Sequence, residues 1–319
     1  MTGRTVGIVG AGAVGQIVGA LLVGEPWCDR LMIASRTAES AGALVADLGD
    51  MAHVVHAGTR VRAVTVAELD QADAVVVCPR ATFTNTATRN VRMAGLAANA
   101  PLIADLARAF TGYARPVVMV TYPVDVLSRL FATISGAPTY GIGSATDTAR
   151  YRAALAAHHR VPVWAVDGYV IGEHGDGAVI CASTTTVHGA PCTVPLDLVR
   201  AELAQRPRRI NAGIGRTRHG PAAAVLSAVR KLLDVEDGTD VLSVNRAGVW
   251  LGIRLHIRAG RPSVQPLELD AHETADLLTA RTKLEATYRT ISHHEKGASP
   301  CLRPQPASTP TRQPSPSPA

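Results

Sequence analysis

The feature that most constrains the fold is a run of glycines near the start of the chain, Gly10-Ala11-Gly12-Ala13-Val14-Gly15. It lies inside Val6–Gly24, a stretch of 19 residues without a charged side chain. A stretch of that length could cross a bilayer as one helix, but its six glycines disfavour a continuous helix. We therefore predict a strand, a glycine turn and a buried helix here, and no membrane partner.

The glycine run fits the pattern G-x-G-x-x-G, which binds dinucleotides when it joins an apolar strand to a helix. The first glycine allows the tight turn, the second lets the backbone approach a pyrophosphate, and the third lets helix and strand pack closely. The N–H groups at the helix start attract phosphates. A glycine-rich turn without a ligand is the alternative. The predicted cofactor-binding residues of this turn are Gly10, Gly12, Ala13, Val14 and Gly15.

The second cofactor signal is Ser35-Arg36-Thr37, at the end of the next predicted strand. NAD sites usually carry a carboxylate at this place for the ribose hydroxyls. Here a guanidinium and hydroxyls stand instead, and a guanidinium binds phosphate as a charged fork. We therefore expect NADP(H) to be favoured, with NAD(H) as the other candidate if Arg36 only stacks on adenine.

Apolar strands alternate with helices in the first half of the chain, which predicts an α/β Rossmann domain with a doubly wound parallel sheet. The predicted strands are Val6–Val9, Arg30–Ala34, Val61–Thr65, Ala74–Cys78 and Val117–Thr121, and the helices are Val14–Leu22, Ala38–Leu48 and Arg89–Phe110. A second, α+β catalytic domain follows, with helices at Thr148–His159, Pro221–Leu233 and Ala271–Ile291 and antiparallel strands within Ala178–Val187. The predicted boundaries are 1–143, 144–296 and a disordered, Pro-rich tail at 297–319.

Composition narrows the class of partner. The net charge of +6 comes from scattered arginines, with three lysines and only 4% aromatic residues among the 319, so no nucleic-acid partner is expected. The five cysteines are odd in number and show no CxxC spacing, so neither disulfides nor a metal site is implied. Without a secretory signal at the start, we expect a cytoplasmic protein.

Three further strings complete a pattern: Thr88-Arg89, the segment Asp147–Arg152, and Gly172-Glu173-His174-Gly175-Asp176. Together with the glycine turn, they resemble the lactate/malate dehydrogenase family, the L-2-hydroxy acid dehydrogenases, over residues 4–292. The resemblance implies an NAD(P)-dependent oxidoreductase that acts on a small 2-oxo or 2-hydroxy acid. It also implies a homodimer or homotetramer in which the helix Ala38–Leu48 packs between subunits, with packing within one chain as the alternative.

The resemblance assigns the catalytic roles. Reduction of a ketone places a proton on oxygen, and histidine is the natural donor near neutral pH. By resemblance, His174 is the acid/base and Asp147 orients it. Arg150 binds the substrate carboxylate, and Arg89 reaches the carbonyl oxygen when the loop of residues 80–88 closes. Thr217 lines the substrate pocket or caps a helix.

The chain departs from the family pattern at three places. Phe83 stands where malate enzymes carry arginine and lactate enzymes glutamine, so the substrate is expected to have an apolar or extended side chain rather than be oxaloacetate. Arg80 could still serve a second carboxylate. Tyr122 replaces an asparagine that touches nicotinamide ribose and substrate, and Asn99 comes ten residues after Arg89 instead of about seven.

The sequence leaves two other functions as alternatives. A catalytically weakened, dinucleotide-binding relative with a sensor or scaffold role is favoured by Tyr122 and opposed by the intact Arg89, Asp147, Arg150 and His174. An NAD-dependent glycosidase on a related fold would need a metal held by Cys and His, and no such pairing stands out in the sequence.

Overall fold

The computed structural model describes residues 3–84 and 93–295. These residues form an 11-stranded sheet and a separate three-stranded sheet. In the large sheet the strands follow the order β3-β2-β1-β4-β5-β6-β12-β13-β8-β9, with β14 beside β13. The first six strands in this order are parallel, as predicted for a Rossmann sheet.

Most of the predicted elements of the first half are confirmed. The strands are β1 (Arg4–Val9), β2 (Cys28–Ala34), β3 (Arg60–Ala63), β4 (Ala74–Val77), β5 (Val117–Met119) and β6 (Thr139–Gly141). The helices are α1 (Ala13–Val23), α2 (Ala38–Val54), α3 (Leu96–Ala109) and α4 (Val124–Ser135). The uncharged run Val6–Gly24 thus forms a strand, a turn and a helix, and no helix in the described ranges is long and apolar enough to cross a membrane.

The predicted helix Arg89–Phe110 is wrong at residues 93–95, while its first four residues, 89–92, lie outside the described residues. Met93–Gly95 forms a short 3-10 helix and α3 begins only at Leu96. The ring of Phe83 packs against Gly95, where a Cβ would lie 2.7 Å from the ring's Cζ. This close contact occupies the space that a regular helix side chain at position 95 would need.

The second half continues the same sheet. Its helices are α5 (Gly143–His159), α6 (Leu196–Ile214), α7 (His219–Leu232) and α8 (Ala271–Arg289). Its strands are β7 (Val166–Asp167), β8 (Val170–Gly172), β9 (Ala178–Ile180), β10 (Thr186–Val187), β11 (Ala190–Pro191), β12 (Gly238–Arg246), β13 (Val249–Arg258) and β14 (Arg261–Val264). Helices α4 and α6, strand β6 and the long β12–β13 hairpin were not predicted. Because β12 pairs antiparallel with β6, the two predicted domains share one sheet.

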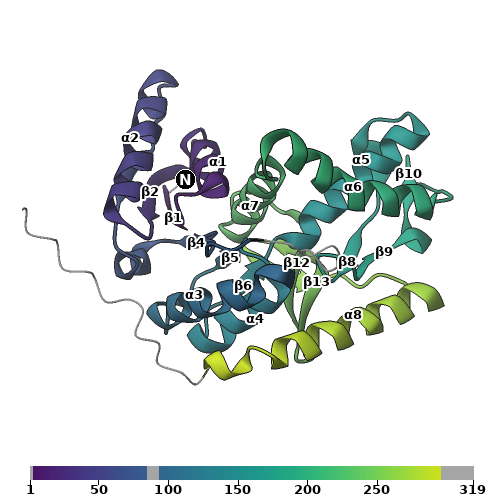
Figure 1. Ribbon diagram of the computed structural model, residues 1–319. Coiled ribbons are helices and arrows are strands. Elements are labelled where there is room, and N and C mark those ends of the chain that lie inside the picture. Colours follow the sequence, from purple (N-terminus) through teal and green to yellow (C-terminus); the bar gives the residue numbers. More distant parts are fainter. Residues whose placement is uncertain (1–2, 85–92, 296–319) are drawn as a thin grey trace, which may run out of the picture.

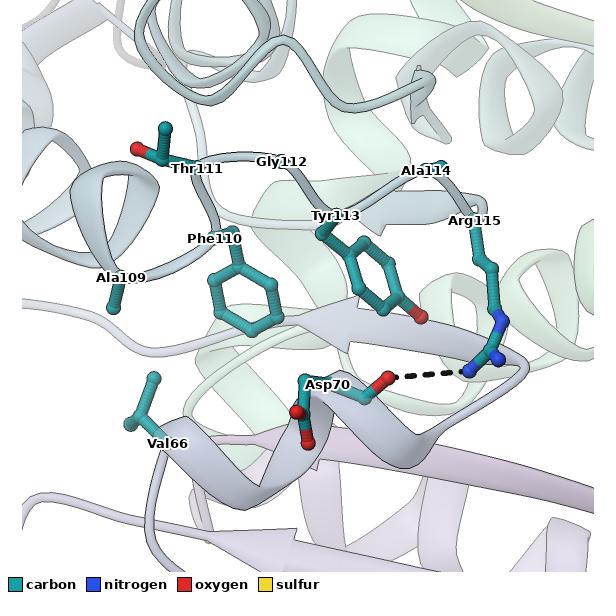
Figure 2. Close-up of a pocket in the computed structure, with 9 residues that line it drawn as sticks. All are labelled: Val66, Asp70, Ala109, Phe110, Thr111, Gly112, Tyr113, Ala114 and Arg115. Carbon is teal, nitrogen blue, oxygen red and sulfur yellow. Dashed lines mark hydrogen bonds between the residues drawn. The ribbon is translucent and has the colours of Figure 1, made fainter.

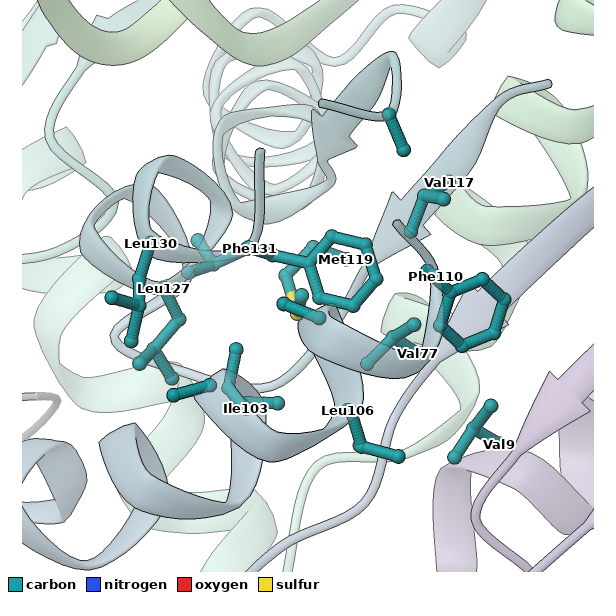
Figure 3. Packing of buried hydrophobic residues seen from close by; sticks show 14 of the residues in the cluster. Val9, Val77, Ile103, Leu106, Phe110, Val117, Met119, Leu127, Leu130 and Phe131 are labelled. Atoms are coloured by element: carbon teal, nitrogen blue, oxygen red, sulfur yellow. The ribbon is translucent and has the colours of Figure 1, made fainter. Parts of the chain in front are cut away.

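Helices cover both faces of the parallel strands (Figure 1). Side chains alternate along β4, so Val75 and Val77 pack with α3 and α4, while Ala74 and Val76 face α1, α2 and α7. Figure 3 shows the first of these cores, where Met119 and Phe131 meet between sheet and helices. Burial on both faces explains why these strands are wholly apolar.

Candidate active site

His174 lies in the turn after β8 and is held by glycines. Gly172 has φ +82° and Gly175 has φ +155°, conformations that residues with a Cβ rarely adopt. The ring's Nδ1 lies 2.7 Å from Oδ2 of Asp147, and the side chain is 14% exposed. A carboxylate at Nδ1 accepts the proton of that nitrogen, so Nε2 is the atom left for proton exchange.

Asp147 and Arg150 both project from α5, three residues apart. The guanidinium of Arg150 donates to Oδ1 of Asp147 at 3.3 Å, so the two oxygens of Asp147 serve two different side chains. The side chain of Arg150 is 9% exposed and that of Asp147 is 4% exposed. A spacing of three residues predicts that both side chains lie on one face of the helix, and this contact confirms it. We call His174, Asp147 and Arg150 the His174 cluster.

The sheet brings the His174 cluster to the carboxyl edge of the parallel strands. Gly141, at the end of β6, pairs with Ser243, which pairs with Gly252, which pairs with Gly172 at the end of β8. The His174 side chain packs on the start of α5, because a Cβ at Gly143 would lie 2.4 Å from its Cγ. Ligands of open α/β sheets bind at this edge.

The glycine turn has the geometry that the pattern predicts. Gly10 has φ +114°, and a Cβ at Gly15 would lie 1.9 Å from the carbonyl oxygen of Gly10. A Cβ at Gly12 would meet nothing within 4 Å, so the backbone there faces open space. Gly12 is also the N-cap of α1, and Ala13 and Val14 open the helix. Unpaired N–H groups at a helix start can bind a pyrophosphate, so the residues fit a dinucleotide.

The segment Ser35-Arg36-Thr37, the second predicted part of the cofactor site, lies where β2 ends and α2 begins. Thr37 is the N-cap of α2, and its Oγ1 accepts the N–H of Ser40 at 3.2 Å. The hydroxyl of Ser40 donates to that of Ser35 at 2.7 Å, and Arg36 is exposed beside them. Thr37 and Ser35 therefore shape the loop, while the guanidinium of Arg36 lies at the surface.

Three side chains gather after β4 and β5, and we call Arg80, Phe83 and Tyr122 the Phe83 cluster. The Cζ of Arg80 lies 4.3 Å from the centre of the Phe83 ring and 6.0 Å from that of Tyr122. These are cation–π distances. The guanidinium of Arg80 thus lies within reach of both aromatic rings.

Asn99 ties the two segments of the Phe83 cluster together. Its Oδ1 accepts the N–H of Ala81 and its Nδ2 donates to the carbonyl of Tyr122, each at 2.9 Å. Asn99 is 1% exposed. Although it comes late in the sequence relative to Arg89, its amide bridges the segments that follow β4 and β5.

Three other residues singled out in the sequence have different outcomes. Arg89 lies outside the described residues. Thr217 lies between α6 and α7, and Arg218 is the N-cap of α7, so the helix-capping alternative for Thr217 is wrong. Arg152, two residues after Arg150, is predicted to lie on another face of the helix and to pair structurally. It donates to the carbonyl of Gly168 at 2.9 Å and pairs with Asp167, which is such a role.

Sequence reasoning assigned no role to two carboxylates beside His174. Asp125, in the first turn of α4, accepts the backbone N–H of His174 at 2.8 Å. Glu173 is 2% exposed and binds Nζ of Lys283 on α8 at 2.8 Å. An acidic residue in a helix's first turn is common, so nothing local marked Asp125, which lies 49 positions from its partner.

A pocket of about 330 Å³ lies elsewhere (Figure 2). It is lined by Val66, Asp70 and the segment 109–115, which lead into β4 and β5 and so lie at the amino edge of the sheet. Arg115 is engaged there, donating to the carbonyls of Asp70 and Ala72 at 3.1 and 2.8 Å. The pocket is therefore separate from the glycine turn and the His174 cluster.

Comparisons with known proteins agree with this geometry. Residues 4–144 match the family model described as lactate/malate dehydrogenase, NAD binding domain. The chain is 32% identical to an L-lactate dehydrogenase of Deinococcus radiodurans over 228 residues, which cover 70% of this chain and 73% of that protein. It is 30% identical to L-lactate dehydrogenase 2 of Lactiplantibacillus plantarum over 263 residues, 77% of this chain and 82% of the relative.

Solved structures show the same fold. A malate dehydrogenase from Plasmodium falciparum superposes with a TM-score of 0.84 at 18% identity, covering 93% of this chain and all of that one. The relatives found by sequence and by structure therefore include both lactate and malate enzymes.

Proposed function

Because this chain belongs to the lactate/malate dehydrogenase family, we propose that it is an oxidoreductase acting on a 2-oxo acid and its 2-hydroxy acid. The observation that carries the proposal is the His174 cluster, in which a carboxylate holds a histidine and an arginine side by side. That arrangement supplies a proton donor and a carboxylate-binding cation within one small site. It lies at the edge of the sheet that also carries the glycine turn.

A bound nicotinamide cofactor supplies the hydride for this chemistry. The open backbone at Gly12 and the start of α1 would hold its pyrophosphate, because a Cβ at Gly12 would meet no described atom within 4 Å. His174 donates the proton to the carbonyl oxygen from Nε2 and takes it back in the reverse reaction. Asp147 keeps Nδ1 protonated and stabilises the imidazolium.

Three further residues are proposed to contact the substrate. Arg150 binds the substrate carboxylate, since a guanidinium can bind it with two parallel hydrogen bonds. Arg89 stabilises the charge that develops on the carbonyl oxygen, and Thr217 lines the substrate pocket. Neither Arg89 nor Thr217 belongs to the His174 cluster, so their roles rest on family membership.

The preferred cofactor is NADPH in this proposal, with NADH as the weaker one. Arg36 is exposed at the end of β2, where a carboxylate would select the unphosphorylated ribose. We expect Arg36→Ala to lower kcat/KM for NADPH about tenfold, the loss of one charge-assisted contact, and to leave NADH nearly unchanged. Arg258→Ala, an exposed arginine on β13, is the control. A wild-type preference for NADH would contradict this.

The substrate proposed here carries an apolar or extended side chain and no second carboxylate. Phe83 cannot pair with a carboxylate, and the Arg80 guanidinium is already stacked on its ring. The chain is further proposed to form a homodimer or homotetramer through α2, whose last residue Val54 and C-cap Val55 are 79% and 51% exposed. It is also proposed to act in the cytoplasm.

The deciding experiment is a panel of 2-oxo acids assayed with NADPH and with NADH, by loss of absorbance at 340 nm. We expect turnover of pyruvate or branched 2-oxo acids that His174→Ala abolishes. A much higher kcat/KM for oxaloacetate would overturn the substrate proposal. Cofactor binding without turnover of any acid would favour the sensor or scaffold alternative, which the unusual Tyr122 favours.

A further inference from the structure

The pocket at the amino edge of the sheet lies beside the place where the described part of the chain ends. Arg108, directly before the lining segment 109–115, donates to the carbonyl of His294 at 2.7 Å. That carbonyl belongs to the short 3-10 helix Ser292–Glu295, which follows α8 and packs on α3 and α4. Residues 296–319 therefore leave the described chain next to the pocket.

The pocket offers an apolar floor and one carboxylate. The ring of Phe110 points toward Val66 and Asp70 (Figure 2). Phe110 and Tyr113 are 3% and 8% exposed, so their rings, which we call the aromatic floor, suit small apolar groups. Asp70 is exposed, and within residues 3–84 and 93–295 its carboxylate has no hydrogen-bond or ion-pair partner. Arg115 binds the backbone carbonyl of Asp70 instead.

Residues 296–319 match this pocket in charge and in composition. They carry three basic side chains and no Asp or Glu. One of these, Arg303, stands directly before Pro304-Gln305-Pro306. Proline-rich segments bind to aromatic-lined grooves because they are already extended and lose little conformational freedom. Arg303 comes eight residues after Glu295, so at a rise of about 3.1 Å per residue it reaches roughly 25 Å from the described chain.

A segment of the same chain has an advantage over any free ligand at this place. Its attachment beside the pocket gives it an effective concentration in the millimolar range, so even a few weak contacts are enough to hold it. The pocket volume of about 330 Å³ is at the lower end of the range for binding sites. That volume suits a short extended segment better than a folded partner.

We propose that this pocket binds residues 300–306 of the same chain. The guanidinium of Arg303 pairs with the carboxylate of Asp70, and the prolines lie against the aromatic floor. The contact fastens the end of the chain to the Rossmann half of the molecule. Because the pocket is separate from the His174 cluster and the glycine turn, this contact is independent of the proposed reaction.

Disulfide trapping in the full chain tests the proposal, because the segment 300–306 carries Cys301. Ala114→Cys places a thiol at an exposed position of the lining. Ala286→Cys, at an exposed position of α8 before the same chain end, is the matched control. With oxidised glutathione, Cys301 should bond to the thiol at position 114 at least about tenfold faster than to that at position 286. Mass spectrometry of tryptic peptides measures both rates.

Three substitutions test the ion pair. Asp70→Asn and Arg303→Gln should each slow the trapping at position 114 about threefold, the size of effect expected of an exposed ion pair. The two together should slow it no further, because they remove the same contact. Arg312→Gln, in the same tail but outside the proposed segment, is the control and should leave the rate unchanged.

Each other outcome overturns the proposal. Equal trapping at positions 114 and 286 would indicate undirected encounters of the tail. Trapping at position 114 that Asp70→Asn and Arg303→Gln leave unchanged would exclude the proposed ion pair. A disulfide between two chains, seen as a dimer on a non-reducing gel, would assign the pocket to the tail of a second copy. If Ala114→Cys does not fold, Thr111→Cys, at another exposed position of the lining, takes its place.

Discussion

The His174 cluster and the Phe83 cluster flank the same edge of the sheet but are held together by different interactions. In the first, the side chains of His174 and Arg150 both contact the carboxylate of Asp147. In the second, the guanidinium of Arg80 lies within cation–π distance of the rings of Phe83 and Tyr122. In the proposed function, the first cluster carries the proton transfer of the family's reaction and the second selects the substrate side chain.

The difference teaches which parts of such a site can vary. Proton transfer requires one geometry, because a histidine has to be held by its partner in one tautomer. Recognition of a substrate side chain has no such requirement, since apolar, polar and charged surfaces each select their own ligand. The predictions below test the two clusters in turn.

The largest effect is expected at His174. His174→Ala removes the proton donor, so kcat should fall about 10²- to 10⁴-fold. Stopped-flow measurement of a single turnover of NADPH oxidation gives the chemical step directly. Cofactor binding, followed by fluorescence, should stay nearly unchanged because the glycine turn is proposed to hold the pyrophosphate. A variant that keeps most of its rate would break the assignment of acid/base chemistry to this cluster.

A smaller loss is expected at Arg150. Arg150→Lys keeps the charge but loses the planar fork that matches a carboxylate. A charge-assisted hydrogen bond contributes about 1.5–3 kcal/mol, so kcat/KM should fall about 10- to 100-fold, mainly through a higher KM. The matched control is Arg152→Lys on the same helix, whose guanidinium binds the carbonyl of Gly168 instead. Equal losses in both variants would indicate a structural role for Arg150.

The Phe83 cluster offers a test of stability through Asn99. Asn99→Ala leaves the N–H of Ala81 and the carbonyl of Tyr122 without their partner in a buried place. The free energy of unfolding should fall by about 1–3 kcal/mol, measured by urea denaturation. Asn211→Ala, at an exposed position of α6, should have little effect. If Asn99→Ala is as stable as the wild type, the bridge does not hold the cluster together.

Local patterns predicted one cluster better than the other. The spacing of Asp147 and Arg150 was enough to predict that both side chains lie on one face of a helix, because three residues are nearly one turn. The conformation of the glycine turn could also be predicted, since it requires glycine at fixed positions. The contacts of Arg80 with two rings and of Asn99 with two segments depend on how separate loops meet, which no periodicity in the sequence records.

The same limit applies to the fold. The alternation of strands and helices predicted the parallel sheet, because strands buried on both faces are wholly apolar. Helix α4 and the β12–β13 hairpin were not predicted from the sequence. Yet α4 brings Asp125 to His174, and the hairpin joins β6 to β8. Elements whose importance lies in distant pairing leave the weakest local signal.

The smallest expected effect concerns specificity at Phe83. Phe83→Arg places a guanidinium where malate enzymes carry one, so the ratio of kcat/KM for oxaloacetate to that for pyruvate should rise about tenfold, equivalent to about 1.4 kcal/mol. The guanidinium of Arg80 lies 4.3 Å from the centre of this ring and would repel the new charge. The double variant with Arg80→Gln should therefore show a larger rise in this ratio.

Two further variants sharpen this last test. Phe83→Leu keeps an apolar side chain and should leave the ratio unchanged, which separates the new charge from the loss of the ring. Arg80→Gln alone should change the ratio little if Arg80 only stacks on Phe83 and Tyr122. If Arg80→Gln instead removes an existing activity toward oxaloacetate, Arg80 binds a second carboxylate of the substrate. The cation that binds this carboxylate would then stand at position 80 rather than at position 83.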